Sequence, residues 1–395
     1  MKIKGMKIKG PTATCSDLKD VLSNPPHDMT DRKKLIATLS KDACALPVND
    51  ITTKDVLENL KGKKIAYTVD DETLTVYARH NEDKAITCCS LQPNLKLIGQ
   101  HNEDYLFAYR FHLKSLENAR LEFFSPDFMQ NQDKEKINYT GHKASPNLIF
   151  NKGELAGQIL TKTFDSQALG EKRLYDLYIP KGFKPDDNAG IVILGDGRSL
   201  GFHIRQWEPM IVSGQMRNFV AIGVRSGRRA IVDPKEPYDF DVRNADYIHG
   251  YKKGPQRFDQ HLSFVADELL PSVKSELGLD TPAEKTVLIG GSSAGSFALW
   301  GTMKRPDVFG VSIGMSPSGP IPEDVSSEAA TRTYYISAGI YEPGFRANAI
   351  GYESVLKSSN ATTDLKSYPD GHSADQRAQR MVEVLPLIFP VQKND

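Results

Sequence analysis

A serine that could act as a nucleophile lies in a glycine-rich segment between an apolar run and a helical pattern. Ser293 has glycines two positions before and two positions after it, at Gly291 and Gly295. In a strand, G-x-S-x-G, helix arrangement, the tight turn lifts the serine hydroxyl above the edge of a sheet, and the small residues let the two backbones approach. We therefore predict that Ser293 is a nucleophile. Its neighbour Ser292 lacks glycines at both of these positions.

A nucleophilic serine needs a base, and the base needs an acidic group that orients it. His372 is the only histidine after Ser293, and it follows the expected strand 364–368. The order serine, acid, histidine is the one expected for an α/β-hydrolase. Glu342 follows another expected strand, 333–337, and is our candidate for the acid. Two carboxylates near the histidine in sequence remain alternatives, Asp370 and Asp375.

The chemistry also needs backbone donors for the oxyanion that forms when a carbonyl is attacked. We expect the N–H of Ala294, at the start of the helical pattern, to be one donor. A second should come from the turn after the expected strand 190–194, at Gly197 or Arg198. This turn is also rich in glycine, but its spacing is G-x-G-x-x-x-G, which departs from the dinucleotide-binding fingerprint. We expect Asp196 to hold the turn in place.

Several elements must position these groups. From about residue 155 onward, short continuous apolar runs alternate with helical patterns, which is typical of a doubly wound, mostly parallel sheet. Examples are the expected strands 219–224 and 286–289 and the expected helix from Phe258 to Val273. We therefore assign residues 155–395 to an α/β domain of the α/β-hydrolase class.

The preceding residues have a different pattern. Short runs at period two between residues 51 and 126 predict a small all-β sandwich domain. Residues 127–154 are polar and are interpreted as a linker. Residues 1–50 contain a duplicated basic start and a short helical segment. The basic start is not followed by the apolar stretch of an intact signal peptide.

The composition excludes some classes of function. Lys+Arg and Asp+Glu both number 50, so the formal net charge is zero and does not favour nucleic acid or a membrane surface as a partner. No run of 18 apolar residues is present, so we expect no membrane span. The four cysteines show no C-x-x-C spacing, and we expect neither a metal nor a cofactor.

The motifs around the expected strand ends resemble the enterochelin (enterobactin) esterase family, in the esterase-D-like branch of α/β-hydrolases. The resemblance covers about residues 170–390. Its most specific part is the acid loop, 338–348. The other motifs are 194–197, 243–247, 268–271, 291–295 and 370–372. The β-rich region resembles the N-terminal sandwich domain of that family. One segment departs from the family pattern, because 316–322 contains no aromatic residue after its serines.

The resemblance implies a serine esterase that hydrolyses ester bonds through an acyl-enzyme, with a small-molecule ester, such as a ferric siderophore, as its substrate. It implies a cytoplasmic protein that releases iron. Arginines in loops after the strands agree with an anionic ligand. Arg243, Arg225 and Arg205 are our candidates for substrate binding, and Arg198, Arg228 and Arg229 lie in similar loops.

Other interpretations remain open at this point. A disulfide between Cys15 and Cys44 would instead place the protein in the periplasm or outside the cell, after removal of a leader. A carbohydrate-associated acetyl or feruloyl esterase is the alternative enzyme, and it would use exposed aromatic residues on the sandwich. Tyr77, Tyr105 and Tyr109 are available for that role. The alternative from another class is a non-catalytic binding or effector protein on a hydrolase scaffold.

Overall fold

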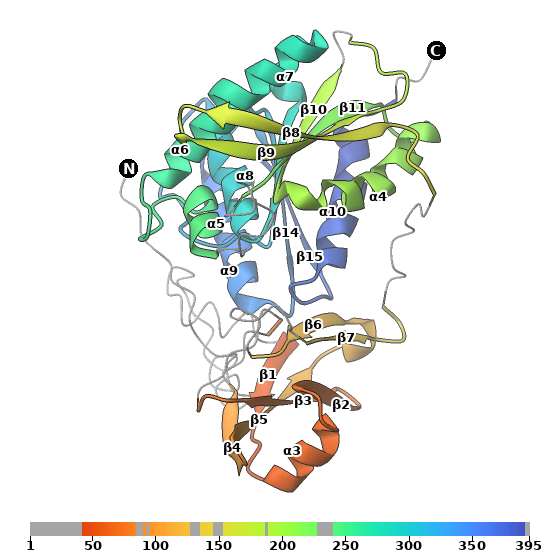
Figure 1. Ribbon diagram of the computed structural model, residues 1–395, viewed down its shortest axis with the longest axis vertical. Coiled ribbons are helices and arrows are strands. Elements are labelled where there is room, and N and C mark those ends of the chain that lie inside the picture. Colours follow the sequence, from red (N-terminus) through yellow and green to blue (C-terminus); the bar gives the residue numbers. More distant parts are fainter. Residues whose placement is uncertain are drawn as a thin grey trace.

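The computed structural model describes residues 42–83, 90–91, 95–126, 135–144, 153–185, 189–226 and 240–391. These residues form a large domain built on an eight-stranded sheet and a smaller β domain at one end of it (Figure 1). The sequence therefore predicted the fold class, an α/β-hydrolase-like sheet preceded by an antiparallel β domain.

The large sheet has the order β15-β14-β13-β12-β10-β11-β9-β8. Its strands from β10 to β15 pair in parallel, and β9 and β8 pair antiparallel at one edge. Four expected strands are found here with shifts of at most a few residues. The bounds are β8 Gln158–Ser166, β9 Glu171–Ile179, β10 Gly190–Gly195, β11 Phe219–Val224, β12 Thr286–Gly291, β13 Val311–Met315, β14 Thr333–Gly339 and β15 Thr362–Tyr368.

Helices cover both faces of this sheet because its central strands are apolar on both sides. Strands β10 and β11 are buried along their whole length. Helices α4 (Leu200–Val212) and α10 (Ala374–Ile388) pack on one face. The other face is covered by α6 (Arg257–Ser263), α7 (Leu270–Leu277), α8 (Ser293–Lys304) and α9 (Pro343–Ser358). A π-helical turn, Phe264–Leu269, joins α6 to α7, so the expected helix is present but irregular. The short helix α5 (Phe240–Tyr247) contacts α6 and α8.

The β domain contains a five-stranded antiparallel sheet and a separate hairpin. In the sheet, β5 (Asp104–Leu113) pairs with β3 (Thr73–His80), β1 (Ala43–Leu46) and β4 (Lys96–His101), and β2 (Ile65–Asp70) pairs with β3. The hairpin is β6 (Arg120–Phe124) with β7 (Lys136–Thr140). Apolar side chains of sheet and hairpin share one core, which gives the two-layered packing expected of a sandwich.

Two boundaries differ from the sequence prediction. Strand β7 lies inside the expected linker, where its alternating pattern of half-buried and exposed residues is too polar to indicate a strand without its partner β6. Strand β1 lies inside the expected helical segment, and it pairs with the end of β5. The sequence also missed helix α3 (Thr53–Leu60), which begins at a capping box formed by Thr52 and Asp55. The helical patterns of residues 11–39 lie outside the described residues.

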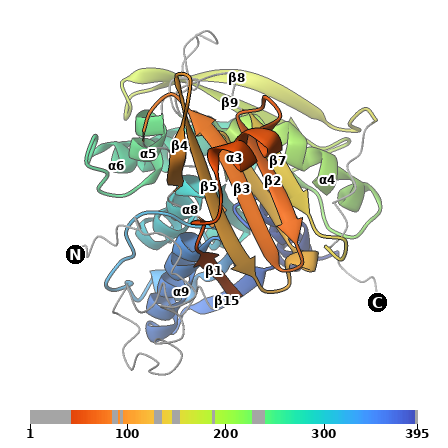
Figure 2. The ribbon, with the colours of Figure 1, turned by 90° about the horizontal axis from the view of Figure 1, so that it is seen from below.

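The β domain is placed against the loops that follow β14 and β15 (Figures 1 and 2). The backbone N–H of Leu91 donates to the carbonyl of Tyr341, and Arg346 pairs with Asp42 at 3.0 Å. Because ligands of open parallel sheets bind beyond the carboxyl ends of the strands, the β domain borders the place where a site is expected. Among the described residues, no helix is long and apolar enough to cross a membrane.

Candidate active site

The turn between β12 and α8 has the geometry of a nucleophile elbow. The strand ends at Gly291, the helix begins at Ser293, and Ser292 alone joins them. Ser292 has φ 60° and ψ −126°, a conformation that residues with a side chain rarely adopt. Such strain persists where the surrounding structure enforces it, and it is frequent at functional sites. The structure therefore marks Ser292 as the apex of the turn.

The close approach of strand and helix fixes the same register. A Cβ on Gly290 would overlap the backbone of Ala294, so the residues two before and two after Ser292 are in contact. A Cβ on Gly291 would instead meet the side chain of Arg377. The glycine pair on which the prediction of Ser293 rested is thus not the pair that lets the two backbones approach. Ala294 is small enough for the position two residues after the apex, whereas the prediction from the sequence required a glycine there.

Ser293 is the first residue of α8 and is buried. Its hydroxyl donates to the side-chain oxygen of Asn244 at 2.8 Å and accepts a bond from Ser318 at 3.3 Å. Ser292 is partly exposed and lines a cavity. The structure therefore places Ser292 at the partly exposed apex of the elbow, where we expected Ser293.

His372 and Glu342 are brought together as the sequence predicted. Nδ1 of His372 lies 2.5 Å from Oε2 of Glu342. Glu342 is fully buried, and its other oxygen accepts bonds from the hydroxyl of Ser316 at 2.6 Å and the N–H of Gly339 at 2.5 Å. These donors satisfy the carboxylate and fix its orientation. Burial lowers the pKa of His372 below its usual value, against the opposing effect of Glu342.

The two alternative acids are placed elsewhere. Asp370 is buried and bonded to Arg120 of β6, at 2.9 and 2.7 Å. Asp375 lies in the first turn of α10, whose N-cap is Ser373. Neither is bonded to His372 in the described structure. The geometry therefore selects Glu342 as the partner of the histidine.

The described residues show no hydrogen bond from His372 to Ser292 or Ser293. The ring of His372 is stacked on Phe345, with centroids 4.2 Å apart. Catalytic hydrogen bonds are often long before a substrate binds, so this arrangement is compatible with a base that engages the serine in a complex. Phe345 was missed by the sequence analysis, although it lies in the acid loop three residues after Glu342.

The candidate oxyanion donors lie around the elbow. Ala294 is buried in the first turn of α8, where backbone N–H groups have no partner within the helix. Gly197 lies in a 3-10 turn that packs so closely on Gly223 that a Cβ would overlap its backbone. Arg198, in the same turn, is exposed. With Ser292 at the apex, Ser293 is the residue that follows it, and Ala294 lies one position further along α8.

Asp196 holds this turn, as expected. It has φ 56°, and its carboxylate accepts bonds from Arg243 at 2.9 and 2.6 Å and from Ser226 at 3.0 Å. Its own N–H donates to the hydroxyl of Tyr247 at 2.7 Å. Although burial favours the neutral acid, Arg243 holds the pKa of Asp196 below its usual value.

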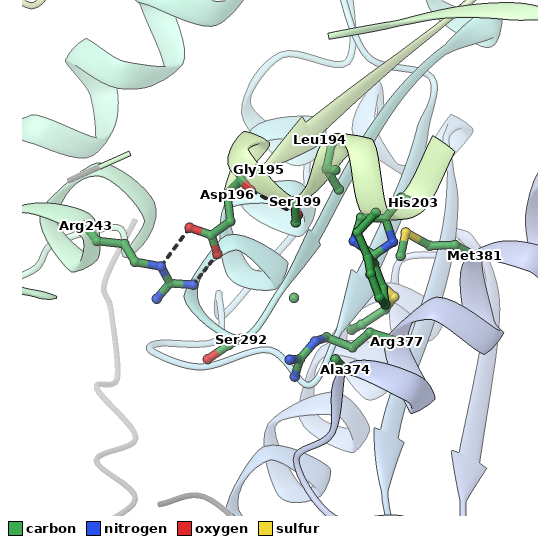
Figure 3. A pocket seen from close by; sticks show the side chains of 13 residues that line it. Leu194, Gly195, Asp196, Ser199, His203, Arg243, Ser292, Ala374, Arg377 and Met381 are labelled. Atoms are coloured by element: carbon green, nitrogen blue, oxygen red, sulfur yellow. Dashed lines mark hydrogen bonds and ion pairs between the residues drawn. The ribbon is translucent and has the colours of Figure 1, made fainter. Parts of the chain in front are cut away.

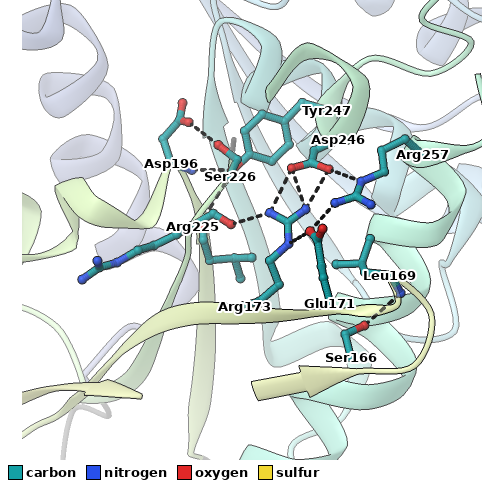
Figure 4. Close-up of polar contacts among 11 residues, drawn as sticks. Ser166, Leu169, Glu171, Arg173, Asp196, Arg225, Ser226, Asp246, Tyr247 and Arg257 are labelled. Carbon is teal, nitrogen blue, oxygen red and sulfur yellow. Dashed lines mark hydrogen bonds and ion pairs between the residues drawn. The ribbon is translucent and has the colours of Figure 1, made fainter. Parts of the chain in front are cut away.

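A second ion-pair network anchors helix α5 beneath this turn (Figure 4). The buried Arg173 of β9 pairs with Asp246 of α5 at 3.1 Å, and Arg257 pairs with the same carboxylate at 2.8 Å. Glu171 contacts both arginines. Because α5 also carries Arg243 and Tyr247, this network fixes the elements that hold Asp196.

A cavity of about 350 Å³ opens beside the elbow (Figure 3). It lies between the ends of β10 and β12 and helices α4 and α10. Its wall contains Ser292, two arginines, Arg243 and Arg377, and apolar side chains. The sequence analysis missed Arg377 because it lies inside a helix and not in a loop after a strand.

The other predicted arginines do not line this cavity. Arg225 pairs with Asp176 at 2.7 Å, and Arg205 donates to the carbonyl of Gly153 at 2.7 Å. Arg228 and Arg229 lie outside the described residues. Of the arginines proposed for substrate binding, only Arg243 is at the cavity. Among the described residues, no cluster of His, Cys, Asp or Glu could hold a metal ion.

The sheet order, the strained turn after β12 and the carboxylate–histidine pair after β14 and β15 are those of an α/β-hydrolase-like fold. Residues 166–350, within the region of the large sheet, match the family model described as "Putative esterase". The chain is also 27% identical to the uncharacterized protein YjcH of Bacillus subtilis over 164 residues, and these residues are 41% of this chain. The match spans 62% of that protein's length.

Solved structures share the whole two-domain fold. The enterobactin esterase of Shigella flexneri, crystallised in the presence of enterobactin, superposes with a TM-score of 0.55 over 87% of this chain and 99% of its own, at 13% identity. The ferric enterobactin esterase of Salmonella typhimurium gives 0.52 over 83% and 98%, at 14% identity. At this level of identity the likeness shows the fold and not the substrate.

Proposed function

We propose that the protein is a serine esterase in which Ser292 is the nucleophile, His372 the base and Glu342 the orienting acid. The observation that carries the proposal is the carboxylate–histidine pair after β14 and β15, together with a serine held at φ 60° in the turn after β12. The three residues follow the chain order expected for this fold. The esterase family match supports the same reaction class.

The reaction follows from these positions. The hydroxyl of Ser292 attacks the ester carbonyl while its proton passes to Nε2 of His372. The N–H of Ser293, at the positive end of α8, stabilises the oxyanion of the tetrahedral intermediate. His372 then gives the proton to the leaving alcohol, and an acyl-enzyme remains on Ser292. Water, deprotonated by His372, releases the acid and restores the serine.

Adjacent serines provide a matched test of the nucleophile. We expect Ser292→Ala to abolish hydrolysis of p-nitrophenyl butyrate and labelling by a fluorophosphonate probe. We expect Ser293→Ala to keep the label, because only its backbone takes part. Loss of the label in Ser293→Ala, with labelling retained in Ser292→Ala, would show that Ser293 is the nucleophile. Labelling of neither serine in the wild-type protein would support a non-catalytic role for the scaffold.

For the substrate, we propose an anionic ester of the siderophore type. The two-domain fold shared with enterobactin esterases supports this, as do the aromatic rings of Phe345 and Phe202 at the site. They offer aromatic faces that the segment 316–322 lacks. The carbohydrate alternative loses its support, because Tyr77 and Tyr109 are buried and Tyr105 packs against the core. Incubation with ferric enterobactin and with feruloylated xylan, followed by product analysis, separates the two proposals.

For the compartment, we propose an oxidising environment in place of the cytoplasm. Cys44 is disulfide-bonded, which supports this because disulfides persist mainly in such compartments. Its expected partner, Cys15, lies outside the described residues. Alkylation of the native protein followed by intact-mass measurement tests the proposal. Four alkylated cysteines without prior reduction would contradict it.

A further inference from the structure

The cavity beside Ser292 contains one positive charge that the protein does not neutralise. Arg243 is paired with Asp196 through two hydrogen bonds, so these two opposite charges compensate each other. Arg377 approaches the cavity from the first turns of α10 and lines it together with Ser292 (Figure 3). Among the described residues, Arg377 forms neither a hydrogen bond nor an ion pair.

Arg377 is half-buried, and one of its nitrogen atoms is shielded from water. Its Nη1 atom is buried without a hydrogen-bond partner, although a guanidinium carries five N–H donors. A buried polar group without a partner is rare in native structures and costs free energy. Glu342, the carboxylate with the strongest electrostatic effect on Arg377, is already bonded to His372, Ser316 and Gly339. The donors of Arg377 therefore remain available to a ligand.

The rest of the wall indicates what kind of ligand fits. Five of its side chains are apolar, from Leu194, Phe202, Met315, Ala374 and Met381. His203 adds a ring whose pKa burial lowers to about 3, so it is neutral near pH 7 and contributes no charge. A wall that combines one uncompensated cation, Arg377, with several apolar side chains suits a short hydrocarbon that ends in a single anionic group. A carboxylate matches the planar guanidinium best, because it can accept two parallel bonds.

We propose that Arg377 anchors a carboxylate in the substrate site, so that among small esters the protein prefers those that also carry a free carboxylate. The proposal deepens the proposed esterase function and rests on it for turnover. Because Ser292 lines the same cavity, a carboxylate bound at Arg377 would leave the ester group of a short molecule near the nucleophile. Arg377 would then determine specificity through binding and not through the chemical step.

A pair of matched esters tests this role. Monomethyl glutarate carries a carboxylate, and methyl valerate is its uncharged counterpart of similar length. We expect the wild-type protein to favour the glutarate ester in kcat/KM by at least tenfold, measured by pH-stat titration. In Arg377→Gln the ratio of the two values should fall to about one. Because both esters react through the same catalytic residues, the ratio of their kcat/KM values cancels any effect of the substitution on His372 or on stabilisation of the oxyanion.

A control and a binding experiment complete the test. Arg205→Gln removes a neighbouring arginine that does not line the cavity, and it should keep the wild-type ratio. Calorimetry with glutarate and Ser292→Ala measures the anion site without turnover, and we expect binding that Arg377→Gln abolishes in this background. Hydrolysis of both esters with a ratio that Arg377→Gln leaves unchanged would overturn the carboxylate proposal alone. Glutarate binding that depends on Arg377, without hydrolysis of any ester, would overturn only the esterase function.

Discussion

Arg120 and Asp370 form a buried ion pair that joins the β domain to the loop carrying His372. Nε and Nη2 of Arg120 donate to the two carboxylate oxygens at 2.9 and 2.7 Å, and both side chains are almost fully buried. Asp370 lies two residues before His372 in sequence. Ser90 reinforces the connection, since its hydroxyl accepts a bond from the N–H of His372 at 3.2 Å. The β domain therefore supports the base of the proposed reaction directly.

Arg120→Leu should both destabilise the protein and reduce its activity. The substitution leaves the buried carboxylate of Asp370 without its partner, which typically costs about 3–5 kcal/mol. The free energy of unfolding, measured by urea denaturation, should fall by that order, and kcat should fall because the histidine loop is displaced. The double variant Arg120→Leu, Asp370→Asn should recover part of the stability. If the double variant is as unstable as the sum of the single variants, the pair does not act as a unit.

Glu342→Gln should slow ester hydrolysis strongly while the protein stays folded. The amide keeps the size of the side chain but no longer stabilises the positive charge that His372 acquires during the reaction. Loss of the acid in a comparable triad costs about 10⁴-fold in kcat, so we expect at least a thousandfold loss here. Asp375→Asn is the matched control, because Asp375 is not bonded to the histidine. A larger loss in Asp375→Asn than in Glu342→Gln would refute the assignment of the acid.

The pH dependence of hydrolysis should show a base that titrates below the usual histidine value of 6.5. Burial lowers the pKa of His372, and Arg377 lowers it further. A lower pKa keeps the ring neutral to lower pH, so kcat/KM for the uncharged p-nitrophenyl butyrate should remain high below pH 6.5 before it declines. Arg377→Gln should raise this pKa and move the acidic limb to higher pH. A limb at or above 6.5 in the wild-type protein would contradict the prediction.

The sequence predicted those parts of the molecule that depend on local pattern. Buried parallel strands are continuous apolar runs, so β10, β11 and β12 could be located within a residue or two. The pairing of Glu342 with His372 could be predicted because both follow strand ends at the same edge of the sheet. Strand β7 could not be found, because it is stabilised by a hairpin partner and its own residues are polar.

The features that the sequence did not predict depend on three-dimensional contacts. The register of the elbow depends on the close approach of Gly290 to the backbone of Ala294, which leaves no room for a Cβ on Gly290. This approach can be seen only in the folded structure. Arg377 lies in a helix, and from the sequence it resembles an ordinary charged surface residue. The burial of its Nη1 atom without a partner depends on how α10 packs against the elbow. The Arg120–Asp370 pair joins residues 250 positions apart, so no local pattern could indicate it.

His261 should make the protein sensitive to acid. It lies on α6 with no exposed surface, both of its ring nitrogens lack partners, and burial lowers its pKa to about 3. The unfolded chain binds a proton at this residue near pH 6.5, whereas the folded protein binds it only near pH 3. Stability contributed by the neutral ring is therefore present above pH 6.5 and is lost as the pH falls from 6.5 to 3, by roughly 1.4 kcal/mol per pH unit.

A substitution at this residue tests the acid sensitivity. His261→Phe fits the aromatic surroundings of Tyr247 and Phe297, and it should reduce the slope of the free energy of unfolding against pH between 3 and 6.5. The free energy of unfolding, measured at pH 4, 5 and 6, checks this, with the exposed His101→Phe as the matched control. An unchanged slope in His261→Phe would show that other groups cause the acid sensitivity.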